Sequence, residues 1–156
     1  MKNMTVFCLI LVSIVLVSCK NEEKQKVTEE IEKPISVACY QALYEQDTIE
    51  LTVNTLKNGK VSGNMVMKMF DLPEKVGKIS GAFRGDTLFA DYSFIQGSYE
   101  KRQFKNPIAV LKRGEEFILG NGKIETYLGA SYFAKGEPID FDNVKYKFKT
   151  VNCVEK

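Results

Sequence analysis

The stretch ISGAFRGDTLFADYSF, residues 79–94, alternates apolar with polar or small side chains on both sides of Gly85 and Asp86. A period of two residues is typical of a β-strand that buries one face. A two-residue turn at Gly85 and Asp86, of type II′ because glycine comes first, keeps the apolar side chains of both strands on one face. The stretch therefore predicts an antiparallel hairpin with one buried face. Its register predicts three facing pairs, namely Phe83 with Leu88, Gly81 with Ala90, and Ile79 with Tyr92.

A second hairpin is predicted from TIELTVNTL, residues 48–56, and the strand that follows it. A two-residue loop at Asn58 and Gly59 would place an apolar residue of one strand opposite a polar residue of the other. A three-residue loop of Lys57, Asn58 and Gly59, with Gly59 in the left-handed conformation, avoids this mismatch. The predicted register then pairs Leu51 with Met65 and Ile49 with Met67.

The same period recurs along the rest of the chain and indicates about eight short strands joined by short turns. The candidates lie at residues 38–45, 47–56, 60–70, 77–84, 87–95, 102–112, 115–119 and 143–152. Strands in this meander order predict an all-β fold, an antiparallel up-and-down barrel in which the first strand pairs with the last. A two-sheet β-sandwich is the alternative. Residues 124–133 are expected to form a helical turn or an irregular crossover.

The N-terminal segment combines a positive start, an apolar run and a cysteine. The apolar run of residues 6–17 is shorter than the roughly 20 residues that cross a bilayer, and with Lys2 before it the pattern is typical of a secretory signal peptide. Residues 16–19, LVSC, resemble the lipobox of bacterial lipoproteins. The resemblance implies that residues 1–18 are removed and that Cys19 becomes the lipid-bearing N-terminus, with palmitate among its acyl chains. An ordinary signal peptide or an internal apolar strand is the alternative.

The residues that follow the lipobox are mostly charged. They predict a flexible tether over residues 19–37, ahead of a barrel domain over residues 38–156. Residues 20–23, KNEE, resemble the lysine and acidic tag that directs lipoproteins of Bacteroidota to the cell surface. We therefore expect a protein of the bacterial cell envelope, anchored to the outer membrane by its lipid. The cell surface and the periplasmic face remain equal alternatives.

Charge and cysteine content change once the signal peptide is removed. The full chain has 22 Lys and Arg against 20 Asp and Glu, and the signal peptide holds only Lys2, so the mature chain has 21 against 20. This balance provides no strong field for nucleic acid. Cys8 leaves with the signal peptide and Cys19 carries lipid. The remaining Cys39 and Cys153 should form a disulfide in an oxidising compartment, which stabilises the fold by about 4 to 5 kcal/mol in the entropic model.

Two kinds of side chain that often carry enzyme chemistry are missing. The chain has no His, which removes the commonest general base and transition-metal ligand, and no thiol remains free. Asp140, Asp142 and Asn143 lack the glycine and the other ligands of a calcium loop, and residues 119–123, LGNGK, lack the pattern of a phosphate loop. We expect no enzyme, no cofactor and no metal site. An enzyme that uses only carboxylates and hydroxyls is the alternative.

Three methionines, Met65, Met67 and Met69, recur on one face of a predicted strand. Methionine side chains are flexible and polarisable, so they adapt to ligands of varied shape. Aromatic residues on the same inner face would complete a site for a small apolar ligand, and they are Phe83, Tyr92, Phe94, Tyr146 and Phe148. The alternative is that these side chains simply fill the barrel, as in many barrels of about eight strands.

The lipobox, the strand meander and the cysteine spacing together resemble small lipocalin-like barrel lipoproteins. This resemblance implies a membrane-anchored binder of a small apolar ligand, although the chain has no Trp and so lacks the Gly-x-Trp element of true lipocalins. Residues 129–137, GASYFAKGE, are similar to the Ser, Tyr and Lys-Gly loop of the lipoprotein inhibitors of lysozyme, which are also barrels with a disulfide. That second resemblance implies a filled barrel that binds or inhibits an envelope protein.

Overall fold

The computed structural model describes residues 33–98 and 101–153. The predicted signal peptide, the acylation site Cys19 and the tether before residue 33 lie outside the described residues. Strands form where apolar and polar side chains alternate. They are β1 (Ser36–Tyr44), β2 (Asp47–Thr55), β3 (Lys60–Lys68), β4 (Lys75–Arg84), β5 (Thr87–Gln96), β6 (Phe104–Arg113), β7 (Glu116–Leu119), β8 (Ile124–Tyr127), β9 (Ala130–Phe133) and β10 (Lys147–Val151). Across the described ranges no helix is long and apolar enough to span a membrane.

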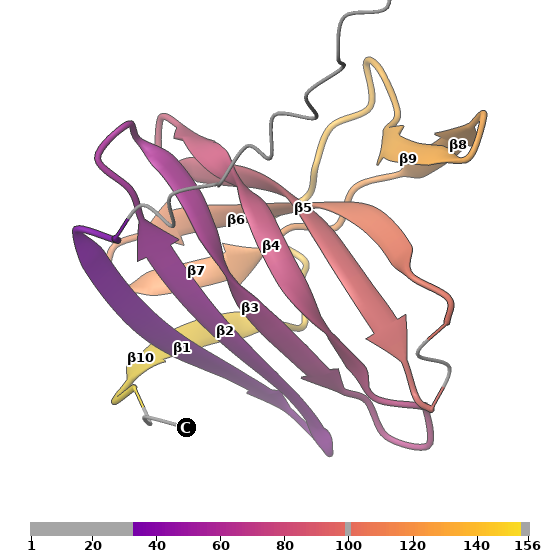
Figure 1. The fold of residues 1–156 in the computed structure, drawn as a ribbon, viewed down its shortest axis with the longest axis horizontal. Helices are drawn as coiled ribbons and strands as arrows, with labels where there is room; N and C mark the ends of the chain where they lie inside the picture. The colour runs from indigo at the N-terminus through magenta and orange to yellow at the C-terminus, as the bar shows by residue number, and fades with distance from the viewer. Residues whose placement is uncertain (1–32, 99–100, 154–156) are drawn as a thin grey trace, which may run out of the picture. The chain divides into compact units, whose positions relative to one another are not determined.

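Eight strands form a closed antiparallel barrel in the order β1-β10-β7-β6-β5-β4-β3-β2 (Figure 1). The predicted up-and-down barrel, closed by pairing of the first strand with the last, is confirmed. Cys39 of β1 and Cys153, just after β10, form the predicted disulfide with their Cα atoms 5.2 Å apart. The bond therefore crosses the seam at which the barrel closes.

Both predicted hairpin registers are confirmed. Gly85 has a φ of 59° at the turn between β4 and β5, and Gly59 has a φ of 76° in the three-residue loop between β2 and β3. The amide of Gly59 donates to the carbonyl of Leu56 at 3.0 Å, which closes that loop. The observed pairs include Phe83 with Leu88, Gly81 with Ala90, Ile79 with Tyr92, Leu51 with Met65, and Ile49 with Met67.

The prediction for residues 124–133 is wrong, because they form a regular two-stranded hairpin, β8 and β9. In Figure 1 this hairpin lies outside the barrel, and its strand β9 contacts β6. Its turn residues Leu128 and Gly129 have φ values of 49° and 80°, as a type I′ turn requires. Leucine rarely adopts a positive φ, so the local sequence gives no sign of this turn.

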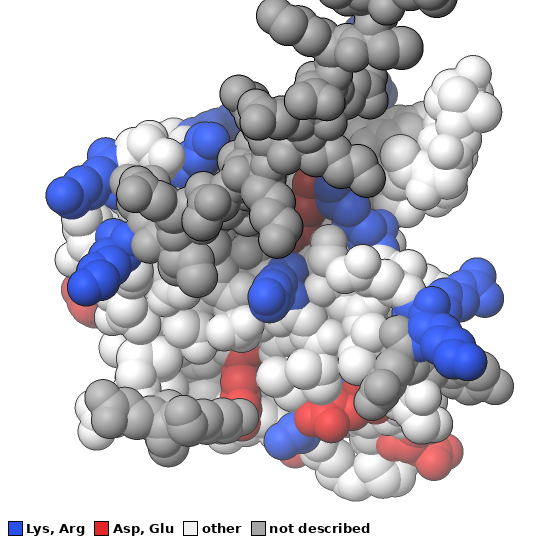
Figure 2. All heavy atoms as spheres, viewed as in Figure 1, with Lys and Arg blue, Asp and Glu red and all other residues white. Residues whose placement is uncertain are grey.

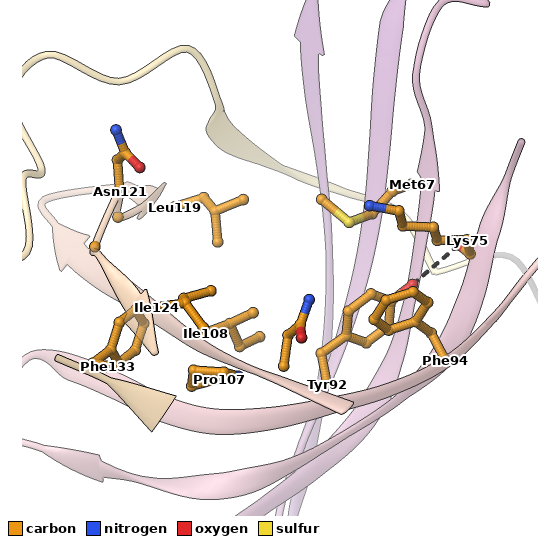
Figure 3. A pocket seen from close by; sticks show the side chains of 13 residues that line it. Met67, Lys75, Tyr92, Phe94, Pro107, Ile108, Leu119, Asn121, Ile124 and Phe133 are labelled. Atoms are coloured by element: carbon orange, nitrogen blue, oxygen red, sulfur yellow. Dashed lines mark hydrogen bonds between the residues drawn. The ribbon is translucent and has the colours of Figure 1, made fainter. Parts of the chain in front are cut away.

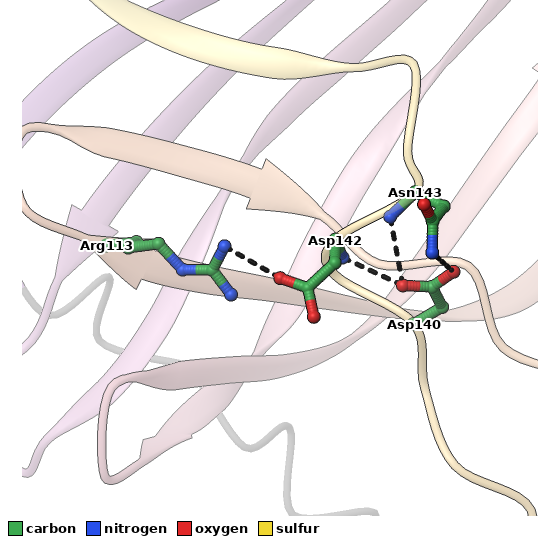
Figure 4. Close-up of polar contacts among 4 residues, drawn as sticks. All are labelled: Arg113, Asp140, Asp142 and Asn143. Atoms are coloured by element: carbon green, nitrogen blue, oxygen red, sulfur yellow. Dashed lines mark hydrogen bonds and ion pairs between the residues drawn. The ribbon is translucent and has the colours of Figure 1, made fainter.

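The last strand is shorter than predicted, because β10 begins at Lys147 rather than near residue 143. The preceding loop is held instead by Asp140, which accepts hydrogen bonds from the amides of Asp142 and Asn143 at 2.8 and 3.1 Å (Figure 4). Arg113 donates to Asp142 at 2.9 Å and ties the same loop to the end of β6. These carboxylates therefore have a structural role in the loop.

The barrel interior is packed with apolar side chains over most of its length. A side chain of this kind stabilises the fold by about 1.5 to 3 kcal/mol when it is fully buried. The barrel is therefore largely filled, and a ligand has only the space that these side chains leave. The buried members of the core are Ala42, Ile49, Leu51, Val53, Val61, Met65, Ile79, Leu88, Ala90, Tyr92, Phe94, Ile108, Val110, Phe117 and Phe148.

The barrel wall is incomplete beside the first half of β6. The short strand β7 pairs only with Val110–Arg113 of β6, and one further hydrogen bond of 2.9 Å joins the amide of Gly120 to the carbonyl of Ala109. In the part of the chain that the structure describes, residues 104–108 are hydrogen-bonded to no strand on this side, although β9 contacts β6. The chain leaves the wall here and continues outward to β8. This gap positions the candidate site.

Candidate functional site

A cavity of about 190 Å³ lies beside the gap in the barrel wall (Figure 3). An apolar cavity of about 150 Å³ accommodates benzene, whereas drug-sized ligands need roughly 300 to 1,000 Å³. The space therefore suits one ring or a short alkyl chain. Its apolar and aromatic lining consists of Met67, Tyr92, Phe94, Pro107, Ile108, Leu119, Ile124 and Phe133, and its polar lining of Lys75, Asn106 and Asn121.

Two stacked aromatic rings form a rigid wall of the cavity. The ring centroids of Tyr92 and Phe94 are 4.7 Å apart, and Phe94 stacks in turn on Phe104 at 5.5 Å. The Tyr92 hydroxyl lies 3.0 Å from the carbonyl oxygens of both Met65 and Lys75, to which it donates. Burial raises the pKa of Tyr92 well above its usual value, and the nearby Glu74 contributes to the rise. Tyr92 is therefore neutral, and its one hydroxyl hydrogen is already engaged.

Lys75 is the only cation in the lining of this cavity. It lies on the inner face of β4, because it alternates in phase with Gly77 and the buried Ile79. Its Nζ atom lies 5.5 Å from the centroid of the Phe94 ring, within the range of a cation–π contact. Figure 3 shows the side chain extending across the rings of the aromatic wall toward Met67. The half-buried Lys75 residue thus presents its ammonium group to an otherwise mainly apolar space.

Two asparagines add amide groups to the same lining. Asn106 faces Tyr92 across the β5–β6 pair, and Asn121 is held by backbone hydrogen bonds of 2.8 and 2.9 Å to Asp140. Neither Asp nor Glu is among the lining residues. Within the described ranges no group of three or more metal-binding side chains occurs. The arrangement can therefore hold an apolar or amphipathic molecule, with one cation and two amides to orient it.

Two glycines allow the chain to pass close to this cavity. A Cβ atom on Gly122 would lie 2.7 Å from Cδ1 of Phe133, and one on Gly120 would lie 2.6 Å from Cγ2 of Ile139. Such distances are shorter than any normal contact, so larger residues would displace these neighbours. The motif LGNGK, which lacks the pattern of a phosphate loop, thus shapes the cavity by allowing this close approach.

The structure divides the eight residues predicted to bind a ligand among separate places. Met67, Tyr92 and Phe94 line the cavity. Met65 and Phe148 are fully buried core residues and are not in its lining. The remaining three are also absent from the lining, and they are Phe83, Met69 and Tyr146.

These three side chains have other contacts. The Phe83 ring packs against Phe117 with a centroid distance of 6.2 Å and is 36% exposed. The Tyr146 hydroxyl donates to Asp47 at 2.6 Å and lies 3.3 Å from the sulfur of Met69. Phe83, Met69 and Tyr146 therefore do not form one continuous ligand site with Met67.

The contact between Tyr146 and Asp47 is a structural clasp. Asp47 also accepts a hydrogen bond of 2.7 Å from the amide of Phe70, so it joins the start of β2 to the loop after β3. The hydrogen bond from Tyr146, followed by that from Phe70, lowers the pKa of Asp47. Burial, followed by the same hydrogen bond to Asp47, raises the pKa of Tyr146 to about 12. Both groups therefore keep this hydrogen bond throughout the neutral range.

Several lining residues were missed by sequence reasoning. Lys75 precedes the predicted start of its strand, yet extending the alternation backward from Ile79 would have placed it on the inner face. Asn106 likewise shares the phase of Ile108 in β6. Lys75 and Asn106 are polar residues at positions where the alternation predicts an inward-facing apolar side chain. This mismatch could have identified them as site residues. Nothing in the local sequence indicated the contributions of Asn121 and Phe133, because these depend on the path of the chain after β7.

On the face shown in Figure 2, basic and acidic side chains lie among uncharged ones. The formal net charge of the chain is only +2.

Comparison with known proteins gives no relative from which a function could be inferred. No family model matches the chain, and no match was found among curated proteins or among solved structures.

Proposed function

We propose that the chain is a non-enzymatic lipoprotein of the bacterial cell envelope whose barrel binds a small, mainly apolar ligand. The lipobox at residues 16–19 supports the lipid anchor at Cys19 and attachment to the outer membrane. The single observation that carries ligand binding is the cavity of about 190 Å³ at the gap beside β6. The side chains around it are mostly apolar, which is typical of small-molecule sites.

The rigidity of the site supports the proposal further. The stacked rings of Tyr92 and Phe94 are held in place by hydrogen bonds from the Tyr92 hydroxyl. A wall that is already ordered loses little conformational entropy when a ligand binds. Met67, which pairs with Lys75 across the β3–β4 ladder, can adjust to the shape of the ligand.

The experiment uses indole as a neutral, apolar fluorescent probe of the soluble domain, residues 33–156. The chain has no Trp, so the indole emission can be excited selectively. We expect a saturable change in emission with the folded domain. Met67→Lys places a second charge in the cavity and should weaken binding by about tenfold or more.

The matched control is Asn64→Lys, which introduces the same side chain on the exposed face of the same strand, β3. This variant should bind indole as the parent does. A folded parent that gives no saturable change would contradict ligand binding. Equal binding by the parent and Met67→Lys would place the probe outside this cavity.

A second candidate, a protein-binding or inhibitory module, is favoured by the β8–β9 hairpin. Leu128 at its tip is 87% exposed and the neighbouring Tyr127 is 66% exposed. Exposed apolar residues of this kind are typical of protein interfaces. Lysozyme activity measured with and without the domain tests this candidate. Inhibition that is lost in Leu128→Asn, a residue that tolerates the same backbone conformation, would favour it.

A further inference from the structure

We propose that the ligand is a small amphipathic anion, a monocarboxylate with one ring or a short chain, whose carboxylate binds Lys75 while its apolar part lies against Met67 and Leu119. This inference rests on the proposed function, because it concerns the same cavity. It adds the chemical class of the ligand and the residue that selects it.

Lys75 is a charged residue at a position that faces the barrel interior. It is a half-buried lysine in the phase of Ile79 and breaks the apolar pattern of β4. A charge beside apolar side chains is more favourable when a counter-charge compensates it. The Nζ atom of Lys75 lies over the ring of Phe94, 5.5 Å from the ring centroid. No salt bridge joins Lys75 to any carboxylate among the described residues. A bound anion would supply the missing counter-charge.

Nearby carboxylates are already engaged elsewhere. Glu74, the neighbour of Lys75 in the chain, forms an ion pair of 3.7 Å with Lys68. Asp47 accepts hydrogen bonds from Tyr146 and Phe70, and the oxygens of Asp140 accept hydrogen bonds within their own loop. None of these acids lines the cavity. The cavity lining itself therefore carries one positive charge and no negative one.

The remaining polar groups fit a single carboxylate. Asn106 and Asn121 line the same cavity, and their amide groups make no hydrogen bond to another described side chain. An amide can donate to one carboxylate oxygen while the ammonium group binds the other. One cation matches the single charge of a carboxylate better than the double charge of a phosphate. The volume of about 190 Å³ limits the apolar part to one ring or a short chain.

The test compares three probes that share one hydrocarbon skeleton, namely 3-phenylpropionate, 3-phenylpropanol and 3-phenylpropylamine. Each is titrated into the soluble domain, and dissociation constants are obtained from amide chemical shifts. Hydrogen bonds to charged groups favour binding by about tenfold, so we expect the carboxylate to bind about tenfold more tightly than the alcohol. The amine should bind most weakly, because Lys75 repels it.

Two variants distinguish the contribution of the Lys75 charge to binding from the contribution of the cavity itself. Lys75→Met keeps an apolar side chain of similar length and should weaken binding of the carboxylate by about tenfold, while binding of the alcohol changes less than about twofold. Lys78→Met removes a lysine from the exposed face of the same strand and should leave all three affinities unchanged.

The outcomes distinguish this inference from the proposed function. If the carboxylate and the alcohol bind equally well, or if Lys75→Met weakens both equally, the anion site is wrong while the cavity remains a ligand site. If none of the three probes binds the folded parent, the proposed function itself fails. The comparison of the three probes on the parent protein does not depend on the folding of any variant.

Discussion

Replacing Tyr92 with Phe removes one hydroxyl group from the barrel interior and tests the contact that orders the cavity wall. Tyr92 is 2% exposed, and its hydroxyl lies 3.0 Å from each of the carbonyl oxygens of Met65 and Lys75. The stacking on Phe94 would persist in the variant. A hydrogen bond contributes about 1 kcal/mol net, and a buried acceptor left unsatisfied costs about 1 to 3 kcal/mol. We therefore expect the free energy of unfolding to fall by about 1 to 2 kcal/mol.

Urea denaturation followed by circular dichroism measures this change, with an unchanged dependence on urea concentration as the sign that the fold is intact. The control is Tyr40→Phe. The Tyr40 ring stacks on Phe117 at 4.5 Å, but its hydroxyl makes no hydrogen bond to a described residue. Its loss should change the free energy of unfolding by less than about 0.5 kcal/mol. Equal effects of the two substitutions would refute the claim that the Tyr92 hydroxyl anchors the neighbouring strands.

Three further predictions concern the disulfide, the clasp and the anchor. Because the bond between Cys39 and Cys153 spans a sequence separation of 114 residues, its reduction should lower the free energy of unfolding by about 4 to 5 kcal/mol, and a loss below about 1 kcal/mol in urea titrations would contradict this. The folded state lowers the pKa of Asp47, so its contribution to stability is present above the unfolded pKa and is lost as the pH falls through the folded value. Asp47→Asn should therefore be less stable than the parent at pH 7, and this difference should shrink below about pH 4 when urea midpoints are compared. Cys19→Ala should abolish metabolic labelling with palmitate, and normal labelling would rule out the proposed anchor.

Local signals explain which parts of the fold could be predicted from the sequence. The turn at Gly85 and the loop at Gly59 each require a positive φ that glycine adopts easily, and the alternation beside them fixes the register. The β8–β9 hairpin could not be predicted in this way, because Leu128 adopts a positive φ that its side chain disfavours. The pairing of β8 with β9 compensates for the unfavourable backbone conformation of Leu128.

The candidate site could be predicted only in part, for a related reason. Met67, Tyr92 and Phe94 follow from alternation within single strands. Asn121 and Phe133 lie in segments that approach the barrel only because β7 ends early. Their position depends on the tertiary path of the chain, which no local period encodes.

The disulfide between Cys39 and Cys153 also determines how the domain responds to mechanical force. A pull between a point before Cys39 and a point after Cys153 passes through the covalent bond and leaves the strands between them unloaded. The enclosed loop, with its sequence separation of 114, would otherwise extend to roughly 400 Å when stretched. Under tension along the chain, the oxidised barrel should therefore keep its shape at forces that break the hydrogen bonds of an open sheet. Reduction would release that hidden length in a single step.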